Sequence, residues 1–284
     1  KEEESAIKEK LELAKQKPVK RKRIKIEPDD IMRVVADMIE IPIQQLSKNE
    51  QQKLSKLETT IQKIIIGQDK SVKRVTDAVR RAKLGIAKSE KPLASFLFVG
   101  PSGVGKTHLA KTLAKEIFHQ SDAFLRLDMS EFGESFTISK LVGSPAGYVG
   151  YRESTKLTDH VKQFPHSVIL FDEFEKAHKD VRSLLLQILD DGMLTDATGR
   201  KINFRNTIII MTTNAGRAWF DKTNLGFSDN ENNTEQNREA QLREMLSESF
   251  KPELLNRIGH ICIFNRLNRD ALEKIAKNEL SDLR

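Results

Sequence analysis

The sequence is poor in several residue types, and each scarcity excludes a class of protein. Only one of its 284 residues is a cysteine, Cys262, so the chain holds no internal disulfide and suits a reducing compartment. Apolar runs such as FLFVG and SVILFD are far shorter than the ~20 apolar residues of a membrane span. The first residues, KEEESAIKEK, lack the apolar core of a secretory signal peptide. We therefore expect a cytoplasmic protein, or one of an organelle interior, with no membrane contact.

Aromatic residues are also scarce, and their absence from the basic segment helps to interpret the excess of positive charge. The chain has 48 Lys and Arg against 41 Asp and Glu, a net charge of +7 that permits an anionic partner without requiring one. The densest basic run, KPVKRKRIK at 17–25, could be a nuclear-targeting or nucleic-acid-binding segment or a solvated linker. No aromatic side chain interleaves with its charges to stack on bases. We favour the linker and expect no nucleic-acid partner.

Short apolar runs alternate with helical patterns in the second part of the chain. Before them, apolar spacing predicts helices in 1–16 and near 31–38, and a polar helix at about 48–63. Fully apolar strands that alternate with helices predict an α/β fold, a five-stranded parallel sheet between helices. Ligands of such sheets bind at the carboxyl ends of the strands. The five predicted strands are 96–100, 124–129, 167–172, 207–214 and 261–264.

The first predicted strand leads into a phosphate-binding loop that opens a helix, the context that this motif requires. Glycines allow backbone N–H groups to curl around an anion, and the helix N-terminus adds its dipole. Lys106 is expected to reach the β- and γ-phosphates, and Thr107 to offer its hydroxyl to Mg²⁺. The residues expected to bind the nucleotide are Gly100, Pro101, Ser102, Gly103, Val104, Gly105, Lys106, Thr107 and His108.

Polar residues also end two later strands. Asp172 follows an apolar run, where a carboxylate suits a Mg²⁺ ligand, and Glu173 beside it is placed to activate a water as general base. Asn214 ends the next strand and could hold the attacking water or be an ordinary turn residue. Together these residues predict Mg²⁺-dependent hydrolysis of a nucleoside triphosphate.

Eight motifs in a fixed order are far more specific than the phosphate loop alone. They are Ile65-Ile66-Gly67-Gln68, GPSGVGKT, GYVGY, ILFDEFEKAH, DGMLTDATGR, FRNT, TTNAG and FKPELLNRIGH. With them, the chain from about residue 28 to 284 resembles the second ATPase module of Clp/Hsp100 chaperones, and is most similar to the ClpC/ClpA branch of AAA+ protein unfoldases.

The resemblance implies a division into domains. Residues 64–266 would form the large α/β subdomain of an AAA+ P-loop NTPase, after a helical lead-in at 28–63. Residues 1–27 would be the tail of a preceding module and a basic linker. Residues 267–284 would begin a helical lid that stops before its second-sensor arginine.

The resemblance also assigns roles that spacing alone does not. Ile65 and Ile66 would line the adenine pocket, although the sequence is equally consistent with buried core. Asn214 would be the sensor residue. Arg257 would be an arginine finger that reaches the nucleotide of a neighbouring subunit, which implies a homo-hexameric ring with ATP and Mg²⁺ as cofactors.

The only two tyrosines of the chain lie in AGYVGY, each after a glycine. In the related rings this loop faces the central pore, so Tyr148 and Val149 would grip a translocating polypeptide by sequence-tolerant apolar contact. Tyr151 is equally consistent with packing at the base of the loop. The stretch 195–204 resembles a second pore loop.

Leu225-Gly226-Phe227 is an apolar tripeptide within a polar stretch. On physical grounds it could be an anchor packed on the body or an exposed docking element. ClpA, ClpC and ClpX carry such a tripeptide for the peptidase ClpP, so the resemblance favours docking to ClpP.

Two positions depart from the family pattern. Glu40 stands where a glycine is usual, and Ala197-Thr198 stiffen a loop that is normally more glycine-rich. They leave the fold prediction unchanged and bear on the motion of the loop.

We therefore expect an ATP-dependent unfoldase, itself no protease, that threads unfolded or tagged proteins through a hexameric pore and delivers them to ClpP. A ClpB-like disaggregase without a protease is the alternative. A nucleic-acid motor would need basic residues in place of Tyr148, and an inactive scaffold would not need Glu173. The expected compartment is the bacterial cytosol, with the plastid stroma as alternative.

Overall fold

The computed structural model describes residues 48–84, 90–143, 155–215 and 235–282, with side chains from 52 and 241 onward in the first and last of these ranges. The helices predicted in 1–16 and near 31–38 lie outside them. Residues 52–284 form one compact unit. The helices are α3 (Lys48–Ile64), α4 (Asp69–Lys83), α5 (Lys106–Phe118), α6 (Ser139–Val142), α7 (Thr158–Gln163), α8 (Lys179–Asp191), α10 (Glu235–Ser247), α11 (Pro252–Arg257) and α12 (Arg269–Asp282).

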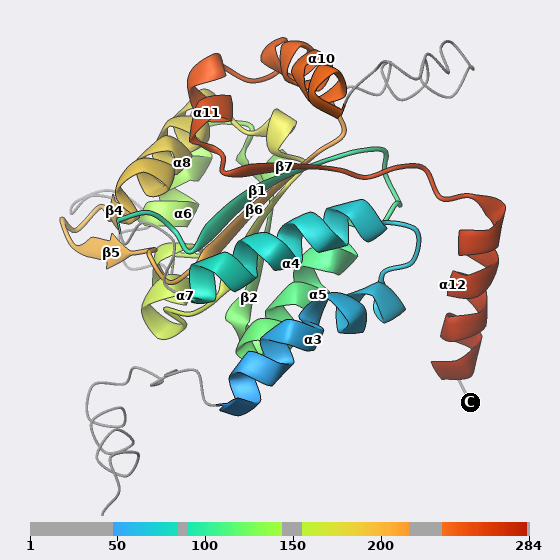
Figure 1. Ribbon diagram of the computed structural model, residues 1–284. Helices are drawn as coiled ribbons and strands as arrows, with labels where there is room; N and C mark the ends of the chain where they lie inside the picture. Colours follow the sequence, from blue (N-terminus) through green and yellow to red (C-terminus); the bar gives the residue numbers. More distant parts are fainter. Residues whose placement is uncertain (1–47, 85–89, 144–154, 216–234, 283–284) are drawn as a thin grey trace, which may run out of the picture. The chain divides into compact units, whose positions relative to one another are not determined.

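A five-stranded parallel sheet forms the centre of the unit (Figure 1), as the sequence predicts. Its order is β2-β3-β6-β1-β7. Each predicted strand is present within two residues of its expected bounds. The strands are β1 (Ala94–Val99), β2 (Phe124–Asp128), β3 (Val168–Asp172), β6 (Ile208–Thr213) and β7 (His260–Ile263).

Both faces of the sheet are covered, which explains why the strands are apolar throughout. Side chains of α3, α4 and α5 pack with Phe96, Phe98 and other residues of one face into a buried core. Side chains of α7, α8, α10 and α11 pack with the opposite face into a second core, around Leu97, Val99 and Phe171. Because β1 alternates between the two cores, every residue from Phe96 to Val99 must be apolar.

A two-stranded antiparallel hairpin of β4 (Met193–Thr195) and β5 (Lys201–Asn203) follows α8. It occupies the stretch that resembles a second pore loop. Asp196 begins its turn. It accepts hydrogen bonds from Thr198 Oγ1 at 2.6 Å and from the backbone N–H groups of Thr198 and Arg200, both at 2.9 Å, and it forms an ion pair with Lys162 at 3.0 Å. Burial raises the Asp196 pKa, but these interactions outweigh it and hold the pKa below its usual range.

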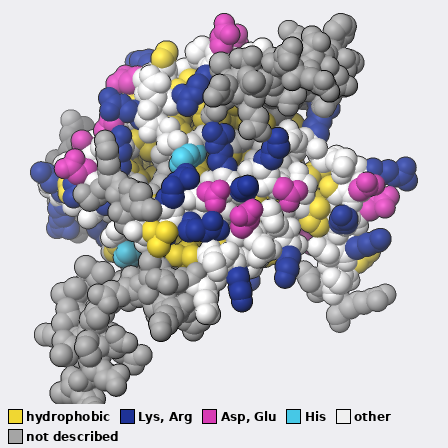
Figure 2. All heavy atoms as spheres, viewed as in Figure 1, with side chains coloured by type: hydrophobic (Ala, Val, Ile, Leu, Met, Phe, Trp, Pro, Cys, Tyr) yellow, Lys and Arg dark blue, Asp and Glu magenta, His cyan; other side chains and the backbone are white. Residues whose placement is uncertain are grey.

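The surface carries charges of both signs. On the face shown in Figure 2, Lys and Arg side chains are interspersed with Asp and Glu and are not gathered in a single stripe. Among the described residues, no helix is long and apolar enough to cross a membrane.

Phe98 provides a test of the core that α3, α4 and α5 form with the sheet. It is fully buried, and its ring centroid lies 5.0 Å from that of Phe264 and 6.1 Å from that of Phe96. Phe98→Ala should lower the free energy of unfolding by about 3–5 kcal/mol, through lost burial and a cavity. Phe136→Ala is the matched control, since Phe136 is 72% exposed; it should change stability by less than ~0.5 kcal/mol. Equal effects in chemical denaturation would contradict this packing.

Candidate functional site

The phosphate loop joins β1 to α5 at the carboxyl edge of the sheet. Gly103 and Gly105 adopt positive φ angles of 78° and 101°, which a residue with a side chain adopts only at a cost. Gly100 is required for another reason: a Cβ there would lie 2.5 Å from the carbonyl oxygen of Phe264. The loop therefore has a backbone path that glycines make possible, with the N-terminus of α5 behind it.

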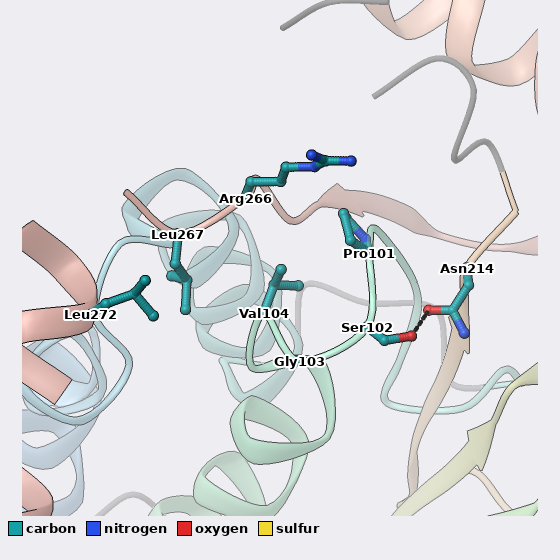
Figure 3. A pocket seen from close by; sticks show the side chains of 8 residues that line it. All are labelled: Pro101, Ser102, Gly103, Val104, Asn214, Arg266, Leu267 and Leu272. Carbon is teal, nitrogen blue, oxygen red and sulfur yellow. Dashed lines mark hydrogen bonds between the residues drawn. The ribbon is translucent and has the colours of Figure 1, made fainter. Parts of the chain in front are cut away.

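Lys106, the first residue of α5, turns back across the loop. Its Nζ donates hydrogen bonds to the carbonyl of Gly100, to that of Pro101 at 2.8 Å and to Asn214 Oδ1 at 2.8 Å. Ser102 Oγ also donates to Asn214 Oδ1, at 3.3 Å (Figure 3). The structure thus brings Lys106, Ser102 and Asn214 together, although Asn214 follows a different strand.

Burial and nearby carboxylates have opposite effects on the pKa of Lys106. Burial lowers its pKa, whereas the negative charges of Glu175, Asp172 and Glu173 raise it, and the result is a pKa of about 8. The residue is only 8% exposed. A buried ammonium group without full compensation suits an anionic ligand such as a phosphate.

Asp172 lies at the end of β3, buried and surrounded by donors. Its Oδ2 accepts from Thr107 Oγ1 at 3.3 Å and from Arg126 Nε at 2.8 Å, and its Oδ1 accepts from Thr212 Oγ1. The two residues expected to ligate Mg²⁺, Thr107 and Asp172, are thus in contact. The Arg126 guanidinium group already pairs with this carboxylate, so a metal ion bound there would have to displace it or share the oxygen with it.

These two residues fit a magnesium site. Mg²⁺ is commonly held by one or two protein oxygen ligands together with substrate phosphates and water. Among the residues that the structure describes, no group of three or more His, Cys, Asp and Glu could hold a metal ion by itself. Phosphate oxygens and water would have to complete the coordination.

Glu173 has an unusual backbone conformation, left-handed with φ 54°. Such a conformation costs about 1–3 kcal/mol and is common at functional sites. Its N–H donates to Thr212 Oγ1 at 3.0 Å, and its carboxylate pairs with Lys176 Nζ at 2.5 Å. The expected general base therefore lies beside Asp172 with its charge engaged by a neighbouring lysine.

A cavity of about 500 Å³ lies beside the phosphate loop (Figure 3), within the size range of ligand sites. Val104, Leu267 and Leu272 give it an apolar wall, and the side chain of Arg266 lies near its edge. The wall combines the loop with the segment before α12 and with α12 itself. An apolar wall next to a phosphate loop suits the base of a nucleotide.

The expected role of Ile65 and Ile66 at the adenine stays a prediction. Ile65 is 3% exposed and belongs to the core beneath α3, α4 and α5. Ile66 is half-buried and lines a second cavity of about 540 Å³, with Gly67, Asn268 and Ala271 among its neighbours. Neither contributes to the wall of the cavity beside the phosphate loop.

His108 lies in the first turn of α5 and is exposed. It is the last of the residues expected to contact the nucleotide, and its exposure leaves it accessible to one.

Gln68 is a site residue to which the sequence analysis gave no role. It is buried; its Nε2 donates to the carbonyl of Asn265 at 2.8 Å and to that of Val104 at 3.2 Å, and its Oε1 accepts from Asn265 N at 3.1 Å. One amide group therefore ties the phosphate loop to the segment after β7. The only sequence signal for this role was that Gln68 belongs to the motif Ile65-Ile66-Gly67-Gln68.

Arg126, Thr212 and Glu175 were missed as well. All three touch residues of the predicted site from neighbouring strands or turns. A polar residue at a strand end was the only available signal for Thr212, whereas Arg126 resembles any surface arginine.

Arg257 lies at the end of α11, away from the residues described above. Its guanidinium group pairs with the carboxylate of Asp190 in the last turn of α8. Within one chain, the structure thus does not bring Arg257 to the phosphate loop.

Tyr148, Val149, Tyr151 and Leu225-Gly226-Phe227 lie outside the described residues. Gly143 and Thr155 are the nearest described residues on either side of AGYVGY. Gly143 lies beside Thr155 and beside Ala197 of the hairpin turn, and Ala197 N donates to Val142 O at 3.1 Å. The described residues before and after AGYVGY therefore lie next to the β4–β5 turn.

Comparison with known proteins places most of the sheet in one family. A family model described as an AAA domain of the Cdc48 subfamily matches residues 91–261. The chain belongs to this family. The match extends from just before β1 to β7, so it includes the phosphate loop, Asp172 and Asn214.

The AAA domain is similar to Clp proteins over most of its length. A ClpA homolog of Porphyra purpurea, named as an ATP-binding subunit of the ATP-dependent Clp protease, is 47% identical over 260 residues, 90% of this chain and 32% of the relative. The chloroplastic chaperone ClpC1 of Arabidopsis thaliana is 45% identical over 252 residues, 87% of this chain and 27% of the relative. ClpE of Bacillus subtilis is 45% identical over 92% of this chain and 37% of the relative.

The fold is also that of Hsp104. A closed-state structure of Hsp104 with ATPγS and FITC casein superimposes with a TM-score of 0.79 at 40% identity, over 91% of this chain and 43% of that one. The expected resemblance to Clp/Hsp100 chaperones is confirmed. The chain spans about a third of the length of the three Clp relatives.

Gln68→Glu tests the link between the phosphate loop and the Asn265 segment. The substitution keeps the shape but replaces the donor by a carboxylate that faces two carbonyl oxygens, so it should cost at least about 1–3 kcal/mol of stability. A fluorescent ATP analogue should also bind more weakly because the phosphate loop loses this link, by about tenfold for each 1.4 kcal/mol of lost binding free energy. Gln163→Glu, at an exposed position on α7, is the control and should change neither quantity. An unchanged affinity in Gln68→Glu would contradict the role of this link.

Proposed function

We propose that this AAA domain is the ATP-hydrolysing module of a Clp-type protein unfoldase. The observation that carries the proposal is the convergence of Lys106, Thr107, Asp172 and Asn214, from the first turn of α5 and the ends of two neighbouring strands, beside a cavity with an apolar wall. Such an arrangement suits a nucleoside triphosphate whose phosphates lie at the loop and whose base lies against the wall. The names of the Clp relatives and of the Hsp104 complexes support ATP and protein substrates.

The residues would divide the chemistry among them. Lys106 would exchange its carbonyl contacts for phosphate oxygens, while the backbone of 100–105 and the α5 N-terminus hold the remaining charge. Thr107 and Asp172 would hold Mg²⁺, which supplies charge neutralisation on the phosphates when bound. Glu173 would leave Lys176 and accept a proton from the attacking water, which Asn214 would orient.

Arg257 would act across a subunit interface. Its separation from the phosphate loop within one chain is consistent with a role in trans, since a finger supplied by a neighbour stabilises charge in the transition state. The proposal therefore includes a homo-hexameric ring. In that ring the ion pair with Asp190 would have to be exchanged for the nucleotide of the next subunit.

The pore would be formed by the two adjacent loops. The described residues before and after AGYVGY lie next to the β4–β5 turn, so Tyr148 and Val149 would emerge beside the hairpin and contact the substrate polypeptide. Structures of Hsp104 with casein, one of them from Saccharomyces cerevisiae in an extended conformation, support a protein substrate, which the ring would thread through this pore.

Delivery to the peptidase ClpP is the finer part of the proposal. Leu225-Gly226-Phe227 would dock to it, and a ClpB-like disaggregase without a protease is the alternative. The relatives include a chloroplastic chaperone and a bacterial Clp subunit, so the proposed compartments are the cytoplasm and the plastid stroma.

Comparing Glu173→Gln with Tyr148→Ala separates the chemistry from the coupling. Glu173→Gln should retain bound ATP and slow hydrolysis by roughly 10²–10⁴, the usual contribution of a general base. Tyr148→Ala should keep hydrolysis within a few-fold of the unmodified protein and lose the unfolding of a tagged, stable substrate. If Tyr148→Ala loses both activities equally, the residue supports the fold and does not grip the substrate.

The double variant Leu225→Ala, Phe227→Ala tests ClpP docking. Each side chain would contribute ~1.5–3 kcal/mol when buried in a cleft, and six loops per ring would add avidity. The double variant should abolish ClpP-dependent degradation, whereas ATP hydrolysis and unfolding continue. Undiminished degradation would favour the disaggregase alternative.

A further inference from the structure

Glu175 is a carboxylate near the phosphate site to which none of the roles above has been given. It belongs to a short 3-10 turn, η4 (Phe174–Lys176), that directly follows β3 and Glu173. Its Oε1 accepts a hydrogen bond from the backbone N–H of Asn214 at 3.0 Å. Its Oε2 is buried and has no hydrogen-bond partner within the described part of the chain. A buried carboxylate oxygen without a partner is costly, so its retention calls for a reason.

The turn that carries Glu175 is rigidly held. Phe174 is fully buried, and its ring stacks on that of Phe250, with centroids 5.9 Å apart. Arg182 of α8 donates from its NH2 group to the carbonyl of Glu175 at 2.7 Å and from Nε to that of Ala177 at 3.1 Å. A carboxylate on such a turn already has a fixed position. It can therefore hold another group in place with little further loss of conformational entropy.

The backbone of Asn214 is held by such a contact with the Glu175 carboxylate. It follows the last residue of β6, where the ladder to β3 has ended, so its backbone N–H has no strand partner and is bound by Glu175 instead. Its side chain accepts from both Lys106 and Ser102.

We propose that Glu175 is a positioning residue that fixes Asn214 through that residue's backbone N–H, so that the Asn214 side chain keeps its place against Lys106 and Ser102. The inference rests on the proposed ATPase activity, in which Asn214 orients the attacking water. It extends that activity by naming the group after β3 that sets the position of the residue after β6. Glu175 acts through Asn214 and touches no reacting atom.

Two variants of Glu175 in the full chain separate its hydrogen bond from the rest of the side chain. Glu175→Ala removes the acceptor and should lower kcat for ATP by about 10- to 100-fold, because a misplacement of about 1 Å can cost that much. KM should stay within about threefold, since the phosphate loop itself is intact. Glu175→Gln keeps an acceptor oxygen and should recover kcat to within about threefold of the unmodified protein. Glu244→Ala, which removes an exposed carboxylate on α10, is the control for loss of charge.

A double-variant cycle distinguishes positioning from general support of the fold. If Glu175 acts through Asn214, then Glu175→Ala combined with Asn214→Ala should be no slower than Asn214→Ala alone. Effects that add, or a Glu175→Gln variant as slow as Glu175→Ala, would overturn the proposal. So would a loss confined to KM.

Amide hydrogen exchange gives a readout that needs no catalysis. Exchange in a peptide covering 208–215 should become faster by at least tenfold at Asn214 in Glu175→Ala and stay unchanged in Glu175→Gln. Unchanged exchange in Glu175→Ala would overturn the inference even if the protein hydrolyses ATP. Faster exchange in a protein that hydrolyses no ATP would support the contact between Glu175 and Asn214 and would contradict only the proposed ATPase function.

Discussion

The compensation of one buried ammonium group is the constraint on which the rest of the site depends. Lys106 lies behind the phosphate loop, and burial there lowers its pKa to about 8 although three carboxylates raise it. The loop carbonyls and Asn214 take up its hydrogen bonds in the structure described. Phosphate oxygens are better partners for such a charge than neutral carbonyls, because they bring the negative charge that a buried ammonium group needs for compensation.

The same constraint links the ends of two strands. Asp172 accepts from Thr212, whose hydroxyl in turn accepts from the backbone N–H of Glu173, and Glu175 accepts from Asn214 N. These contacts cross from β3 to β6 just where the ladder between them ends. Glu173, whose backbone is left-handed, and Glu175 both contact this end of β6. When Lys106 exchanges its hydrogen-bond partners, we therefore expect the residues at the ends of both β3 and β6 to shift.

Much of the fold was predictable because the signals are local. A strand buried on both faces must be apolar throughout, so 96–99 and 208–211 are recognisable without any knowledge of their neighbours. The phosphate loop needs glycines at particular positions and a strand and helix around it, all within one stretch of chain. The weaker predictions concerned single polar residues. Glu175 and Arg126 have no local pattern that separates them from the many other charged residues.

The sequence by itself determined the five strands, the glycine-dependent path of the phosphate loop and the resemblance to Clp/Hsp100 chaperones, because each depends on residues close together in the chain. The tertiary structure alone decided which polar groups meet. The order β2-β3-β6-β1-β7 places β3 beside β6, and it brings Gln68 to Asn265 across 197 residues of sequence. It also leads Arg257 to Asp190 and away from the phosphate loop of its own chain. Strand order follows from how both faces of the sheet are covered, a property of the whole packed domain that no short pattern contains.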